Sequence, residues 1–261
     1  MSLLRCTRPL VLLACVAVAG CASSTTKLDS GLWHYNAGLY GEAIPRLLAA
    51  VPDAERADPA DPRLPTAYVA LGNMAASDKE YARAEKYYTK AIALAKERHP
   101  DDTKLNRNAL VHAGNFLREQ KRPDEAIPLL LAAVSISERV ITIPRLLYAI
   151  DLDNLSLAHT DIKNYEKSEE ASRHALEVMS ELSQTNEVVT AKAVVLYNAA
   201  TRLADLGRTK EAEENYKQAL GGVGANGEQW RKNVVLANYA DFLRKAGRVD
   251  EAKALDAQVK K

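Results

Sequence analysis

Cysteine is almost missing from this sequence of 261 residues. Its three cysteines are Cys6, Cys15 and Cys21, and none follows. Disulfides and cysteine-based zinc sites are therefore excluded for nearly the whole chain. The chain needs a hydrophobic core that is large enough to be stable without such links.

An excess of charge of one sign is also missing. The sequence has 35 Lys and Arg against 34 Asp and Glu, a formal net charge of +1. It has no strongly basic stretch of the kind that nucleic-acid binding requires. Aromatic residues make up only 6%, whereas Ala, Leu, Lys and Glu are abundant and favour helices. Because no stretch alternates apolar and polar residues as a half-buried strand does, the chain is predicted to be all-α.

The sequence has no apolar run that is long enough to span a membrane. The longest extends from Leu10 to Ala19 and follows Arg5 and Arg8. A helix of this length rises about 15 Å, half of the roughly 30 Å of a bilayer core. A basic start, a short apolar run and small residues are typical of a secretory signal.

The apolar run ends at Val18-Ala19-Gly20-Cys21, which resembles the bacterial lipobox. The resemblance implies that residues 1–20 are a lipoprotein signal peptide and that the thiol of Cys21 carries lipid, including palmitate. Residues 21–27 would then form the lipidated cysteine and its tether. Ala22, where Asp would favour the inner membrane, implies the periplasmic face of the outer membrane. The alternative is an ordinary signal peptide that is cut after Ala19 and releases a soluble protein.

A repeat of about 42 residues covers the rest of the chain. Its marker is a small residue at the start of an amphipathic segment, and consecutive markers lie 41, 42, 42, 44 and 40 residues apart. Each marker helix is preceded by another amphipathic segment and a polar or glycine-containing turn, so each unit is predicted to be helix–turn–helix. The markers are Ala43, Ala84, Ala126, Ser168, Ala212 and Ala252.

The second unit carries the large and small residues of a known pattern, at Tyr68, Leu71, Gly72, Tyr81, Ala84, Tyr88 and Ala91. These positions resemble the tetratricopeptide repeat, and the long period is similar to that of its kinesin light chain subtype. The resemblance implies a right-handed solenoid of six helix–turn–helix repeats over residues 28–261.

Several local features are expected from this repeat. Gly207 and Gly247 suit the left-handed backbone conformation that ends a helix. Asp256 replaces the large residue of the last unit, so the last helix is expected to face solvent as a cap. Loops are predicted at Val51–Pro65, His99–Asn106, Ile141–Arg145, Ser183–Glu187 and Gly221–Glu228.

No pattern of catalytic or metal-binding residues stands out. No two histidines lie four residues apart, and no cysteine could join them. Asp151-Leu-Asp153-Asn154 starts like a calcium loop, but it lacks the glycine and closing glutamate, and its apolar spacing predicts a helix instead. We therefore expect no enzyme, no cofactor and no metal.

Asparagine recurs on one face of the first helices. When each marker is numbered position 20 of its repeat, positions 2, 5, 6, 9, 12 and 13 lie opposite the core side. In tetratricopeptide arrays this face lines the groove that binds partners. An amide both donates and accepts, so it can pair with the backbone of an extended peptide. The alternative is that these asparagines only hydrogen-bond neighbouring helices. The candidate partner-binding residues are Asn73, His112, Asn115, Arg118, Asn154, Tyr197, Asn198, Asn238, Asp241 and Arg244.

The sequence thus predicts a non-catalytic scaffold that is anchored by lipid in the cell envelope and binds envelope proteins or extended peptides. Its expected role is the assembly or maintenance of an envelope complex. Three alternatives remain open: a pilotin-like factor for type IV pilus biogenesis, an adaptor for peptidoglycan hydrolases or periplasmic proteases, and a self-associating structural lipoprotein. Neither the identity of the partner nor the oligomeric state follows from the residues.

Overall fold

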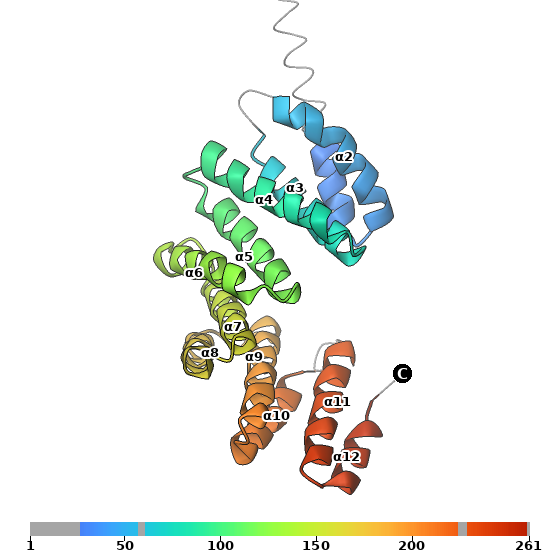
Figure 1. The fold of residues 1–261 in the computed structure, drawn as a ribbon, viewed down its shortest axis with the longest axis vertical. Coiled ribbons are helices and arrows are strands. Elements are labelled where there is room, and N and C mark those ends of the chain that lie inside the picture. The colour runs from blue at the N-terminus through green and yellow to red at the C-terminus, as the bar shows by residue number, and fades with distance from the viewer. Residues whose placement is uncertain (1–26, 57–60, 224–228, 260–261) are drawn as a thin grey trace, which may run out of the picture. The chain divides into compact units, whose positions relative to one another are not determined.

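The computed structural model describes residues 27–56, 61–223 and 229–259. Every regular element in these ranges is an α-helix, which confirms the predicted fold class, and Figure 1 shows the order of the helices. The chain divides into two compact units, an N-terminal unit that ends at Phe116 and a C-terminal unit that begins at Leu117. Cys21 and the predicted signal peptide lie outside the described residues and stay predictions.

The N-terminal unit begins with a helix at residues 27–36. It is followed by α2 (Tyr40–Arg56), α3 (Leu64–Ser77), α4 (Tyr81–Arg98) and α5 (Thr103–Glu119), which reaches the boundary between the units. Leu28, Leu47 and Leu64 are almost fully buried in its core. Lys27 is exposed, so the polar start of this first helix does not enter that core.

The predicted loop at Val51–Pro65 is wrong at both ends. Helix α2 continues through Pro52 to Arg56, because Val51 and Ala54 extend its buried stripe. Helix α3 already begins at Leu64, with Pro65 in its first turn, where a missing N–H costs little. The burial of apolar residues on both sides of Pro52 thus outweighs its tendency to break a helix.

The C-terminal unit contains α6 (Pro123–Arg139), α7 (Arg145–Asp161), α8 (Tyr165–Ser180), α9 (Asn186–Asp205), α10 (Thr209–Gly222), α11 (Gln229–Lys245) and α12 (Val249–Asp256). The four other predicted loops overlap helix ends, because α5, α7 and α9 begin, and α10 ends, inside them. At α9 the Thr185 side chain accepts a hydrogen bond from the Val188 N–H and so fixes the helix start. As predicted, α12 faces solvent, because it buries only Ala252.

Six turns share one backbone conformation at position 15. The residue there has a positive φ of 59–78°, and its N–H donates to the carbonyl three residues earlier. The N–H of the next residue donates to the carbonyl five residues earlier, which is the Schellman motif. Gly207 and Gly247 are confirmed in this role. The six residues are Gly38, Lys79, Lys121, Lys163, Gly207 and Gly247.

Glycine at position 8 lets the two helices of a repeat approach closely. A Cβ on Gly72 would lie 2.7 Å from Tyr88 Cε1, and one on Gly31 would lie 2.6 Å from Leu47 Cδ2. Tyr88 and Leu47 both occupy position 24, on the second helix of their repeats. The predicted complementarity of small and large residues is therefore confirmed in the second repeat and extends to the first.

Candidate interaction surface

The face formed by positions 2, 5, 6, 9, 12 and 13 of the first helices is called the groove face below. All ten candidate residues lie on first helices. They are Asn73 on α3; His112, Asn115 and Arg118 on α5; Asn154 on α7; Tyr197 and Asn198 on α9; and Asn238, Asp241 and Arg244 on α11.

The side chain of Asn198 forms a hydrogen bond with a buried carboxylate. Its Nδ2 donates to Asp153 Oδ2 at 2.9 Å, from α9 to α7. Asp153 is only 7% exposed, and its other carboxylate oxygen has no hydrogen-bond partner among the described residues. Burial raises the pKa of Asp153 to about 6, against the opposing effects of Asn198, Arg118 and Arg202. Asn198 thus supports the packing of neighbouring helices, as the alternative interpretation of the asparagines expects.

Asn154 differs from Asn198, because its half-buried amide forms no hydrogen bond within the described ranges. It lies on α7 directly after Asp153, at position 6 of its repeat. Arg118, at the end of α5, pairs with Asp161 at 3.3 Å. Of the groove-face residues of α7, Asn154 is therefore the one whose amide is available to a partner.

Helix α11 presents the groove face of the last repeat. Asn238 donates to the backbone carbonyl of Val234 in its own helix at 2.9 Å, and Arg244 pairs with Asp241 and Asp256. A cavity of about 270 Å³, called the α11 cavity below, lies between α9 and α11, beside Asn238 and Asp241. Its lining residues are Thr201, Ala204, Asp205, Thr209, Tyr216, Asn238, Asp241, Phe242, Lys245 and Ala246.

Two tyrosines stand close to the α11 cavity. The Tyr216 ring, which lines it, lies 5.4 Å from the ring of Phe242 and 6.4 Å from that of Tyr197, centroid to centroid. Burial raises the pKa of Tyr197 and of Tyr216. The α11 cavity is thus lined by the aromatic rings of Tyr216 and Phe242 together with amide and carboxylate groups.

Asn73 in the N-terminal unit is held by two tyrosines. Its Nδ2 donates to Tyr35 Oη at 2.6 Å, and its Oδ1 accepts from Tyr88 Oη at 2.7 Å. A cavity of about 280 Å³ opens beside it, between residues 27–36, α2 and α3. Its lining residues are Tyr35, Tyr40, Gly41, Ile44, Asn73, Met74, Ser77 and Asp78.

The two cavities open at the same place in the repeat. Each is lined by positions 12 and 17 of one repeat and by positions 9, 10, 13 and 14 of the next. Position 9 is Asn73 in one cavity and Asp241 in the other, and both are candidate residues. The repeat geometry therefore generates side-chain-sized cavities on the groove face of each unit.

His112 and Asn115 lie on α5 within the N-terminal unit. Burial, together with the nearby Arg107, lowers the pKa of His112, so its imidazole is neutral at pH 7. Asn115 Oδ1 is buried and has no hydrogen-bond partner in the described part of the chain. Neither residue lines one of the two cavities.

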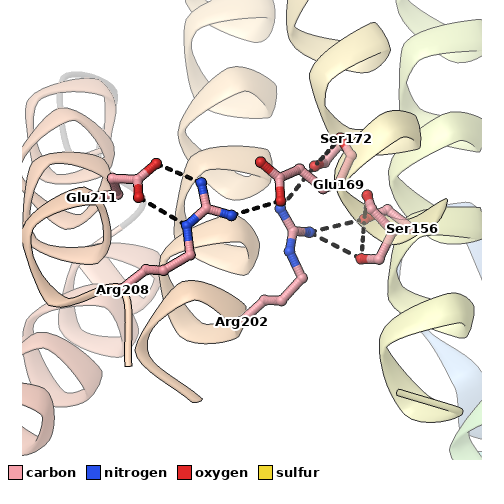
Figure 2. A network of polar contacts seen from close by, with 7 residues as sticks. Ser156, Glu169, Ser172, Arg202, Arg208 and Glu211 are labelled. Atoms are coloured by element: carbon pink, nitrogen blue, oxygen red, sulfur yellow. Dashed lines mark hydrogen bonds and ion pairs between the residues drawn. The ribbon is translucent and has the colours of Figure 1, made fainter. Parts of the chain in front are cut away.

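Arg202 forms a buried network that the sequence did not reveal. It is only 4% exposed, and its guanidinium donates to Ser168 Oγ and Ser172 Oγ, both at 3.0 Å, and to Ser156 Oγ at 3.3 Å. Figure 2 shows the side chain extending from α9 toward Ser156 and Ser172. Burial lowers the pKa of Arg202. A charged group is thus held in the core by neutral hydroxyls.

The serines around Arg202 occupy signature positions of the fourth repeat. Ser156, Ser168 and Ser172 stand at positions 8, 20 and 24, where the second repeat has Gly72, Ala84 and Tyr88. The large residue at position 24 is therefore absent, and Arg202 from position 10 of the next repeat takes its place. Serine at three signature positions of this repeat was the feature of the sequence that could have indicated a buried polar network.

Arg208 adds an ion-pair bridge beside this network. Arg208 is the N-cap residue of α10. It binds Glu211 in the first turn of that helix, with Nη2–Oε2 at 2.6 Å, and Glu169 on α8, with Nη1–Oε2 at 2.7 Å (Figure 2). Arg248 repeats the arrangement with Glu251 and Glu213. These pairs link the second helices of consecutive repeats.

No group of three or more His, Cys, Asp or Glu side chains within the described ranges could hold a metal ion. The predicted helix at Asp151–Asn154 is confirmed as part of α7. Within the same ranges, no helix combines the length and hydrophobicity that crossing a bilayer requires.

Comparison with known families identifies tetratricopeptide repeats in both units. One tetratricopeptide repeat model matches residues 67–99, and another matches residues 106–181. The repeats predicted for these segments are confirmed. This repeat fold is typical of non-catalytic proteins that bind other proteins. No curated protein matches the chain.

Solved structures show the same fold at low sequence identity. A putative kinesin light chain from Podosopora anserina with TPR-like repeats is 14% identical, over 76% of this chain and 94% of that chain, with a TM-score of 0.60. Pseudomonas aeruginosa pilF is 22% identical, over 93% and 92%, with a TM-score of 0.58. PilW, described as a widely conserved type IV pilus biogenesis factor, is 17% identical, over 91% and 92%, with a TM-score of 0.65.

Proposed function

We propose that this protein is a lipid-anchored, non-catalytic scaffold that binds peptide segments of envelope proteins on its groove face. The observation that carries the proposal is the pair of cavities at equivalent repeat positions, one beside Asn73 and one beside Asn238. Cavities of this kind receive side chains, and free amides such as that of Asn154 can pair with a peptide backbone. The lipobox-like sequence supports a location at the periplasmic face of the outer membrane.

The groove is tested by crosslinking in native membranes, followed by mass spectrometry of the captured proteins. The test variant changes Asn154 and Asn238 to Ala, because neither side chain bonds another helix. Asn198 stays unchanged, since it supports Asp153. The control is Asn215→Ala, on the second helix α10 and outside the groove face.

We expect a partner that is captured by the wild type and the control but not by the double variant, with equal helicity in all three. Capture of the same partners by the double variant would contradict binding at these asparagines.

The anchor is tested separately by metabolic labelling with palmitate. Cys21→Ser should abolish the label and release the protein from membranes. Cys15→Ser should leave both unchanged, because Cys15 lies in the proposed signal peptide. A labelled Cys21→Ser variant would reject this lipidation site.

A role in type IV pilus biogenesis is the second candidate. It is supported by the two pilus proteins, which share the fold over 92% of their own lengths. If this role is correct, deletion of the protein should reduce the amount of assembled secretin multimers in the strain that produces it. Normal multimers and normal pili after deletion would reject the pilus role, whereas the proposal of a general scaffold would still hold.

A further inference from the structure

The cavity of the N-terminal unit has a distinctive charge. Of the eight residues that line it, Asp78 is the only Asp, Glu, Lys, Arg or His. Asp78 is exposed, and its carboxylate forms no hydrogen bond or ion pair with the described residues. The cavity therefore presents one negative charge that no described cation neutralises.

Two tyrosines form aromatic walls in the same cavity. The Tyr35 and Tyr40 rings lie 5.7 Å apart at an angle of 45°. Asn73 fixes the hydroxyl of Tyr35, whereas Tyr40 is 51% exposed. Aromatic faces attract cations, most strongly guanidinium and ammonium groups. The walls and the carboxylate thus favour the same kind of ligand.

The remaining lining suits the stem of a long side chain. Ile44 and Met74 provide apolar surface, and the volume of about 280 Å³ is below the roughly 300–1,000 Å³ of pockets for whole small molecules. Arginine and lysine have apolar stems and charged heads. An acidic side chain would be repelled by Asp78, and an apolar one would gain nothing from it.

We infer that the cavity between residues 27–36, α2 and α3 binds an arginine or lysine side chain of a partner peptide, with the cation between Tyr40 and Asp78. The inference rests on the proposed function, because the cavity lies on the groove face.

The equivalent α11 cavity is different, because it combines Lys245 at position 13 with Asp205 and Asp241. Asp241 is also paired with Arg244. The inference therefore concerns the cavity of the N-terminal unit, in which Asp78 is the one charged side chain of the lining.

The test starts from random dodecapeptides displayed on phage and selected on the immobilised full chain. Each selected peptide is synthesised twice, once unchanged and once with citrulline for arginine or acetyl-lysine for lysine. Fluorescence anisotropy then measures both affinities for the wild type and for Asp78→Asn and Tyr40→Ala. The matched control is Tyr81→Ala, because Tyr81 is also exposed and also stands at position 17, but does not line the cavity.

Removal of the peptide charge should weaken binding to the wild type and to Tyr81→Ala about tenfold. The loss should shrink to about twofold in Asp78→Asn and Tyr40→Ala. An unchanged loss in Asp78→Asn, or selected peptides without a basic residue, would overturn the inference and leave the proposed function intact. A library that yields no binding peptide would reject both.

Discussion

The serines around Arg202 allow a quantitative test of the buried network. Changing Ser168 and Ser172 together to Ala removes two hydroxyls that accept hydrogen bonds from the guanidinium at 3.0 Å. Arg202 is only 4% exposed, so water cannot replace the lost acceptors without opening the core. The double variant should therefore destabilise the C-terminal unit, although alanine is the better helix former.

The expected loss follows from the type of bond. A hydrogen bond from a charged donor contributes about 1.5–3 kcal/mol, and breaking the interactions of a buried charge costs about 3–5 kcal/mol. The double variant should thus lose about 3–5 kcal/mol of the free energy of unfolding. In an Arg202→Met background the same two changes should cost about 1 kcal/mol or less, because no buried charge is left without acceptors.

Urea unfolding of the full chain, followed by circular dichroism, measures these free energies. Ser180→Ala is the control, because Ser180 is an exposed residue of the same helix. The wild type, the double serine variant, Arg202→Met and the variant that combines all three changes form a double-mutant cycle. A loss below about 1 kcal/mol in the wild-type background, or an equal loss with Arg202→Met, would refute the view that the serines act through Arg202.

Three further changes test other parts of the structure. Burial raises the pKa of Asp153 from 3.8 to about 6; the native state therefore binds the extra proton, and stability should fall by up to about 3 kcal/mol as pH rises between these values. Asp153→Asn should remove this fall in thermal melts at pH 3.5 and 7.5. Arg248 and Lys217 lower the pKa of Glu213 to about 2. Glu213→Gln should therefore lower the free energy of unfolding by about 1–2 kcal/mol at pH 7, and by less as the pH falls below 4.5. The control Glu214→Gln, at an exposed position, should change little in the same assay. Lys163→Gly should stabilise by about 0.5–1 kcal/mol in urea, because glycine adopts a positive φ without strain; a loss would contradict this.

The sequence was sufficient for the helices and turns because their determinants are local. Small residues such as Gly72 and Ala84 recur at the period of the repeat, and glycine identifies the turns at Gly207 and Gly247. Lysine at the same turn position carries no such signal, and only the register relative to the other repeats reveals it. Helix α2 continues beyond Val51, where a loop was predicted to begin, since the burial of Val51 and Ala54 depends on packing that a local pattern does not contain.

The candidate surface was predictable as a face but not as a set of bonds. Helical periodicity placed the asparagines on the first helices, yet the partner of Asn198 is Asp153, which lies 45 residues away. Whether an amide is free, as in Asn154, or engaged depends on such distant contacts. The role of each asparagine therefore had to come from the structure.

The equivalent positions of the two cavities connect the repeat sequence to ligand chemistry. The backbone supplies the same opening in both units, whereas the residues at positions 9, 10, 13, 14 and 17 differ. Tyr40 and Asp78 favour a cation in one cavity. The other cavity instead combines Lys245 with Asp205 and Asp241.

Residues at positions 13, 14 and 17 are exposed in both cavities, so substitution there changes the bound side chain without disturbing the core. Position 10 is different, because Met74 and Phe242 are buried in the core. Evolution of such a scaffold toward a new partner would therefore alter the exposed cavity positions first and leave the buried positions unchanged.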